Sequence, residues 1–247
     1  MIKVLLALLF PAFAFAGNIH LTKDNHVLIR TDISYESVAK AQYEVAKLVE
    51  KRGTKDYTIY LVLDSPGGSI DAGLSLIEDL KTVKNLETIT LFAASMASAM
   101  VEALPGNRNI TETGVLMFHR ARGGVEGQFE DGELESRLDL YKRMVRKMEA
   151  VNATRMRISL ETYKAQVKDE LWILGFESIV KHAADNVVSV TCSQELIKGQ
   201  ETVSIGFMGM NMAVKFSTCP LIKAGYISNP EQRKMYKKYK QIIRLGF

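Results

Sequence analysis

Apolar and polar residues follow two alternating periods along much of the chain. Short apolar runs predict strands within residues 25–33, 57–63, 87–92 and 114–120. Apolar residues three or four positions apart predict helices within residues 36–52, 69–83, 95–104 and 132–157. This alternation of strand and helix predicts an α/β fold with a largely parallel sheet, in which ligands tend to bind at the carboxyl ends of the strands.

Residues 1–16 have the pattern of a cleavable secretory signal. Lys3 gives a positive start, an apolar run follows, and Ala14 and Ala16 form a small-x-small cleavage site ahead of Gly17. The run is shorter than the ~20 apolar residues that a membrane-spanning helix needs, although an uncleaved anchor is the alternative. We therefore expect an exported protein, in the bacterial periplasm as the first choice and secreted as the second.

Composition limits the function classes but does not select a partner. The 247 residues are 47% hydrophobic and 24% charged, as in an ordinary soluble globular protein and unlike a disordered one. A formal net charge of +4 is mild compared with the concentrated basic stripe that nucleic-acid binding needs. We expect no nucleic-acid partner.

Export changes the interpretation of the two cysteines. Cys192 and Cys219 lie in strand-like segments on either side of residues 201–207. In an oxidising compartment such a pair favours a disulfide, which would add roughly 3–4 kcal/mol on the chain-entropy argument. Two buried free thiols are the alternative.

Three segments carry candidate chemistry. Gly67 and Gly68 follow a predicted buried strand and precede a helix, so their N–H groups can face an anion or an oxyanion. Ser95 lies where a strand gives way to a helix, although a capping serine has the same position. His119 ends an apolar strand, where a single histidine is usually structural. Together they supply a nucleophile, a base and backbone donors at the ends of different strands.

At these residues the sequence resembles the proteolytic subunit family of the Clp proteases, serine peptidases of the Clp/crotonase fold. The segments are "SPGGSIDAGLSLIEDL", "AASMASAM" and "LMFHRARGGVEGQ", in family order, within a match from Asn18 to about Val188. The resemblance implies ClpP/crotonase-like stacked ββα units. It also implies Ser95 as nucleophile and His119 as general base. The N–H groups of Gly68 and Met96 would form the oxyanion hole. Ser98 is the nearest rival serine, one helical turn beyond the motif position.

The third member of the triad is less sharply defined. Against "KDELWILGFES" the family's acid falls on Glu170, with Asp169 as the neighbouring alternative. A glutamate can orient a histidine and stabilise its imidazolium. Other departures from the family are Arg120-Ala121 after the histidine and His182 in place of glycine, which concern the substrate channel more than the chemistry.

By this resemblance the protein is a serine endopeptidase that cleaves peptides or unfolded polypeptides through an acyl-enzyme. An exported enzyme has no ATP and therefore no unfoldase partner. The resemblance places Gly67, Gly123, Gly124 and Val125 along the substrate cleft, and it implies a homo-oligomer formed through the helix at 132–157. We expect no cofactor and no metal; the methionines of "FMGMNM" are interpreted as packing.

The expected domain organisation is a signal peptide at 1–16, a peptidase domain at 17–188, a disulfide-stapled β extension at 189–228 and a basic helix at 229–247. The basic helix is either a solvated charged face or a contact for an anionic membrane surface, aided by Tyr236, Tyr239, Ile242 and Ile243.

Other classes remain open. One is a catalytically silent oligomeric scaffold or peptide-binding module with the same fold, which the departures at Glu170 and His182 keep in view. A crotonase-type enzyme acting on acyl-thioesters is disfavoured by export and by His119. A membrane peptidase with a Ser-Lys dyad is disfavoured because the sequence has no spanning segment after the signal and has a histidine at the matching place.

Overall fold

The computed structural model describes residues 17–123, 130, 132–207, 210–223, 225–227, 229–231 and 233–234. The predicted signal peptide and most of the predicted basic helix lie outside these residues. No helix of the described part is both long and apolar enough to cross a membrane.

Strands and helices alternate through most of the chain. The strands are β1 (Asn18–Leu21), β2 (His26–Ile29), β3 (Ile59–Ser65), β4 (Leu86–Ala94), β5 (Arg108–Phe118), β6 (Leu171–Leu174), β7 (Asn186–Cys192), β8 (Gln200–Phe207), β9 (Met210–Ser217) and β10 (Tyr226–Ile227). The helices are α1 (Tyr35–Arg52), α2 (Ile70–Leu80), α3 (Met96–Ala103), α4 (Glu133–Arg155), α5 (Leu160–Gln166), a 3₁₀ turn η1 (Val167–Asp169), α6 (Glu177–Val180) and α7 (Gln194–Lys198).

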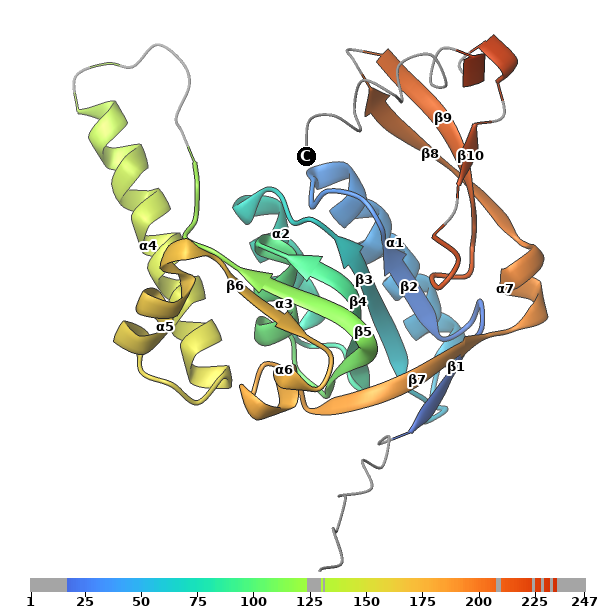
Figure 1. Ribbon diagram of the computed structural model, residues 1–247, viewed down its shortest axis with the longest axis horizontal. Coiled ribbons are helices and arrows are strands. Elements are labelled where there is room, and N and C mark those ends of the chain that lie inside the picture. The colour runs from blue at the N-terminus through green and yellow to red at the C-terminus, as the bar shows by residue number, and fades with distance from the viewer. Residues whose placement is uncertain are drawn as a thin grey trace, which may run out of the picture.

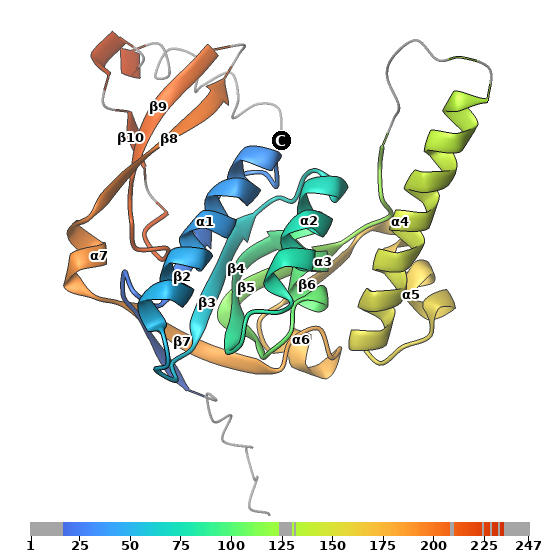
Figure 2. The same cartoon turned by 180° about the vertical axis from the view of Figure 1, so that it is seen from behind.

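The main sheet has seven strands in the order β1-β7-β5-β4-β3-β2, with β6 paired to β5. Every pairing in it is parallel except that of β5 with β6. Helices α1, α2 and α3 lie along one face, while α4 and α5 stand beside them at the β6 side (Figures 1 and 2). This confirms the predicted α/β fold with a largely parallel sheet.

The helix-covered face holds the larger hydrophobic core. Helix α1 begins with a capping box formed by Ser34 and Ser37, and it buries Val38, Ala41 and Val45 on one side. These residues pack with the central strands and with α2 and α3 in one cluster that extends to Phe118. The helix spacing seen in the sequence therefore corresponds to real burial against the sheet.

A buried charge network ties α3 to the strands behind it. The Arg108 guanidinium donates to Glu102 Oε2 and forms a two-pronged contact with Asp185, with Nη2 at 2.7 Å from Oδ1 and Nε at 3.1 Å from Oδ2. The Glu102 side chain is fully buried, and this burial raises its pKa to about 8 despite the opposing effect of Arg108. Removing one partner of such a network leaves a buried group uncompensated, so the network fixes the end of α3 relative to β5 and β7.

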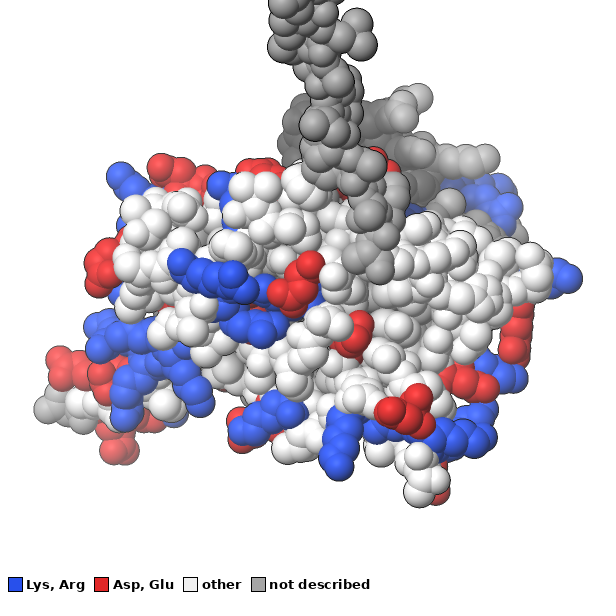
Figure 3. All heavy atoms as spheres, turned by 90° about the horizontal axis from the view of Figure 1, so that it is seen from below, with Lys and Arg blue, Asp and Glu red and all other residues white. Residues whose placement is uncertain are grey.

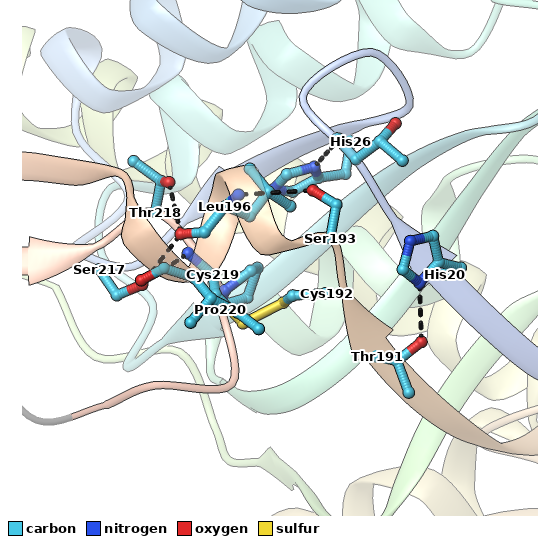
Figure 4. Close-up of a disulfide and its surroundings, with 12 residues drawn as sticks. His20, His26, Thr191, Cys192, Ser193, Leu196, Ser217, Thr218, Cys219 and Pro220 are labelled. Atoms are coloured by element: carbon cyan, nitrogen blue, oxygen red, sulfur yellow. Dashed lines mark hydrogen bonds between the residues drawn. A yellow bond between two sulfur atoms is a disulfide. The ribbon is translucent and has the colours of Figure 1, made fainter.

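The opposite face of the sheet carries a second, smaller core. It contains Leu21, Val62 and Ile89 from the sheet, together with Leu196 and Cys219 from the chain beyond β7. A disulfide joins Cys192 at the end of β7 to Cys219, as predicted, and the surrounding backbone is held by Ser193, Ser217 and Thr218 (Figure 4). The segment after β9 is therefore fastened covalently to the main sheet.

The extension forms its own three-stranded antiparallel sheet, β10-β9-β8. Arg30, which lies just after β2, contacts the end of β9 and the residues that follow it. Its guanidinium donates to the carbonyls of Ser217, Cys219 and Pro220. It also lies 5.0 Å from the Phe216 ring centroid. Lys223 pairs with Asp64 at 2.8 Å. Strand β7 crosses the predicted domain boundary at residue 188, because it pairs with both β1 and β5 in the main sheet.

Charges are distributed over the surface with both signs mixed. On the described part of the face seen in Figure 3, acidic and basic side chains are interspersed and no continuous band of one sign is visible.

Breaking the disulfide should destabilise the fold without dismantling the main sheet. Because the bond closes a loop with a sequence separation of 27, Cys192→Ser with Cys219→Ser should lower the free energy of unfolding by about 3–4 kcal/mol. Urea denaturation of the oxidised wild type and the double variant measures this difference. Equal stability of the two proteins would contradict it.

Candidate active site

Ser95 occupies a strained turn between β4 and α3. Its backbone has φ 55° and ψ −120°, outside the regions that residues with a side chain prefer. Its N–H donates to the Met117 carbonyl at 2.9 Å, and its carbonyl accepts from Ala99 N–H. The Ser95 side chain makes no capping hydrogen bond to α3, so its hydroxyl is not used as a helix cap.

Ser98 stabilises this turn through hydrogen bonds to its backbone. It is fully buried, and its hydroxyl lies 2.7 Å from both the Ser95 carbonyl and the Met117 carbonyl. A serine whose proton is shared between two carbonyls in the core has no access to substrate. The structure thus separates the two serines, with Ser95 in the turn and Ser98 beneath it.

Gly67 lies against the same turn, and Gly68 lies against the backbone of Ile33. Their φ values are 94° and 150°. A Cβ on Gly67 would come within 2.4 Å of the Ala94 carbonyl oxygen and 2.7 Å of Ser95 Cβ, so only glycine fits there. Buried Ser65 accepts the Gly67 N–H at 3.2 Å. The glycine pair therefore permits the close approach of β3 to the Ser95 turn.

Two backbone donors remain without an acceptor at this place. The residues on either side of Gly68 are paired with Ile33. The Ser69 N–H donates to the Ile33 carbonyl, and the Ile33 N–H donates to the Gly67 carbonyl, both at 2.8 Å. Within the described residues the N–H groups of Gly68 and Met96 make no hydrogen bond. Met96 is the first residue of α3, where unpaired N–H groups and the helix dipole favour negative charge.

His119 follows the last residue of β5, on the strand next to Ser95. The register pairs Ala94 with Met117, which places His119 and Ser95 at the same end of neighbouring strands. His119 is half-buried, and its Nδ1 lies 2.5 Å from the Arg120 carbonyl oxygen. A carbonyl at that distance favours the tautomer with the proton on Nδ1, which leaves Nε2 as a base. No hydrogen bond joins Ser95 and His119 within the described residues.

Strand register brings Glu170, and not Asp169, opposite His119. Strand β6 runs antiparallel to β5 and its last printed pair is Leu171 with Phe118, so Glu170 and His119 are the residues that adjoin this pair on the two strands. The Glu170 carboxylate, however, accepts from Trp172 Nε1 at 3.1 Å and pairs with Arg122 Nη2 at 3.4 Å. The structure brings the predicted acid and base to one place without a hydrogen bond between them.

Arg122 and Trp172 are the residues near this pair that sequence reasoning did not single out. Trp172 is the aromatic residue two positions after Glu170, and Arg122 lies in the loop after the histidine. Both residues are visible in the sequence, but the contact of Arg122 with Glu170 joins positions 48 apart and depends on the β5–β6 pairing, which local patterns do not reveal.

The predicted substrate loop is only partly described. Gly123 is exposed, and a Cβ there would come within 2.7 Å of the Tyr141 hydroxyl of α4. Gly124 and Val125 lie outside the described residues. No group of three or more histidine, cysteine, aspartate or glutamate side chains that could hold a metal occurs in the described part.

A family model described as Clp protease matches residues 16–191 of the chain. The chain belongs to the Clp protease family. This confirms the resemblance seen in the glycine, serine and histidine segments, all of which lie inside the match. Clp proteases are peptidases that usually form homo-oligomers and act on peptides. Strands β8, β9 and β10 follow the matched region.

Alanine variants of two glycines separate the energetic cost of a positive φ from the cost of the close contact at Gly67. Gly67→Ala should lower the free energy of unfolding by about 3 kcal/mol or more, because a strained φ is combined with the contact to Ala94. Gly132→Ala is the matched control: its φ is 78°, but a Cβ there meets nothing within 4 Å, so about 1 kcal/mol is expected. Urea denaturation of both variants measures the difference, and equal losses would show that the close approach is unimportant.

Proposed function

We propose that this Clp family member is a serine endopeptidase that cleaves peptides or unfolded polypeptides through an acyl-enzyme. The observation that carries the proposal is the strained backbone of Ser95, whose hydroxyl is not engaged in capping and whose turn lies against Gly67. Strain of this kind costs about 1–3 kcal/mol and persists where the surrounding structure holds it, as at active sites.

Chemistry at this site follows from the position of each group. His119 Nε2 would take the proton of the Ser95 hydroxyl as that oxygen attacks the peptide carbonyl. The negative oxygen that develops would be met by the N–H groups of Gly68 and Met96, each worth about 3 kcal/mol to the barrier. His119 then returns the proton to the leaving amine, and water releases the acyl group in a second round of the same steps.

Glu170 is the acid that we assign to orient His119. The β5–β6 register supports it over Asp169, which lies one residue further from the histidine. In the structure its carboxylate is held by Arg122 and Trp172 while His119 Nδ1 contacts the Arg120 carbonyl, so both side chains must turn before Glu170 can accept the Nδ1–H. The exposed Arg122 side chain can release the carboxylate at small cost, since surface ion pairs contribute about 0–1 kcal/mol.

The setting of this activity is part of the proposal. The signal-like residues 1–16 and the disulfide support an exported enzyme, in the periplasm or secreted, that works without an ATPase partner. We assign self-association to α4, which exposes Leu134 and Leu140. Contact of residues 229–247 with an anionic membrane surface also stays a prediction.

A catalytically silent scaffold or peptide-binding module is the second candidate. It is favoured by one observation: within the described residues, neither Ser95 nor Glu170 makes a hydrogen bond to His119. Chemical labelling of the serine separates the two candidates, because only an activated serine reacts rapidly with a fluorophosphonate.

Ser95→Ala should abolish fluorophosphonate labelling and lower kcat for an unstructured peptide by at least about 10³-fold. Mass spectrometry of the labelled wild-type peptide should place the adduct on Ser95. Ser98→Ala is the control, expected to lose stability because of its two carbonyl contacts but to keep the label. Labelling that survives Ser95→Ala, or its absence from the wild type, would refute the nucleophile.

Glu170→Gln should lower kcat by roughly 10²–10⁴-fold, because a neutral amide no longer stabilises the imidazolium of His119. Asp169→Asn removes the same charge one residue away and should leave kcat unchanged. Steady-state hydrolysis of one peptide by the three proteins measures this. The opposite order of losses would assign the acid to Asp169.

A further inference from the structure

A cavity of about 540 Å³, open to solvent where Lys147, Ala150 and Thr154 are exposed, lies between α4 and the ends of α2 and α3. Helix α3 begins after Ser95, whereas the cavity meets its other end at Glu102 and Ala103, so it is separate from the proposed active site. Helix α4 contacts α3 directly (Figure 2). The volume is in the range of small-molecule sites.

Polar groups of the lining are nearly all hydrogen-bond donors. Lys81, Lys147 and Arg155 are cationic, whereas the acidic side chain in the lining, Glu102, is already paired with Arg108. Thr154 is the remaining side chain with a hydroxyl, and it already donates to the Ala150 carbonyl. A cavity rich in donors selects a ligand rich in acceptors, above all an anion.

Two of these groups have unmet hydrogen-bonding capacity. Glu102 Oε1 and Arg155 Nε are both buried and make no hydrogen bond within the described residues. The two side chains are neighbours, since Arg155 acts electrostatically on Glu102. Buried polar atoms without partners are uncommon in folded proteins and ask for a missing partner at that place.

The rest of the lining is apolar. It consists of Ala103, Leu104 and Pro105 after α3, facing Ala150 and Val151 of α4. These side chains offer no hydrogen bonds, so a purely polar anion such as phosphate would leave most of the cavity unused.

We propose that this cavity binds an aliphatic carboxylate, with its head among Lys81, Lys147 and Arg155 and its chain along the apolar wall. The acidic residues that pair with these cations do not use all of their hydrogen-bond donors. Lys81 pairs with Glu78 on the exposed surface, and Arg155 lies 4.0 Å from Asp185, so both cations keep donors for a ligand. The inference is independent of the proposed peptidase activity.

Isothermal titration of the purified mature protein with octanoate tests the proposal. We expect one site per chain with a Kd below about 1 mM. Acetate, which has the head without the chain, and octylammonium, which has the opposite charge, should each bind at least tenfold more weakly.

Variants locate the site. Lys147→Glu should weaken octanoate binding at least tenfold, and Ala150→Phe should abolish it by filling the cavity without changing the charge. Lys142→Glu is the matched control: it makes the same charge change on α4 outside the lining and should bind as the wild type does. Circular dichroism and urea denaturation of all three variants verify that the fold is intact.

Absence of octanoate binding up to about 10 mM would overturn the proposal. So would equal affinities of Lys147→Glu and Lys142→Glu, because octanoate would then bind elsewhere. Unweakened binding to Ala150→Phe would have the same meaning.

Discussion

The close contact between Gly67 and the Ala94–Met96 turn is the constraint on which the candidate active site depends. With φ 94° and no room for a Cβ, Gly67 brings the end of β3 against the backbone of Ser95. Ser95 in turn holds a φ of 55°, stabilised by its hydrogen bond to Met117 and by the hydroxyl of Ser98. The Gly67 turn and the Ser95 turn both have an unfavourable backbone conformation. Each is stabilised by its contact with the other and by the pairing of β4 with β5.

Local patterns were sufficient to predict much of this arrangement. Strand and helix periods located α1, α2, α3 and the central strands, because these elements bury one regular face in the core. The glycine pair, Ser95 and His119 were recognisable because each stands at the end of an apolar strand, and a parallel sheet brings such ends together. The disulfide was predictable from two cysteines and the signal-like pattern of residues 1–16.

Other features depend on contacts between distant segments and could not be seen locally. Strand β5 begins at Arg108, six residues before the predicted run. The apolar pattern does not reveal this part because most of its residues are polar, and Arg108 belongs to the network with Glu102 and Asp185. The short strand β6 shows no alternation strong enough to predict its pairing with β5. The proposed choice of Glu170 over Asp169 depends on that pairing, and Arg122 and Trp172 both contact the Glu170 carboxylate.

The two ends of α3 connect these parts of the protein. At its start lies the strained Ser95, and at its end Glu102 is anchored through Arg108 to β5 and β7. A helix of eight residues has few internal hydrogen bonds and cannot by itself hold a terminal residue in an unfavourable conformation. The buried charge network supplies that rigidity from the far end, while Gly73 of α2 leaves space for the Met96 side chain near the beginning. The strain at Ser95 is thus maintained by packing and electrostatics at both ends of α3.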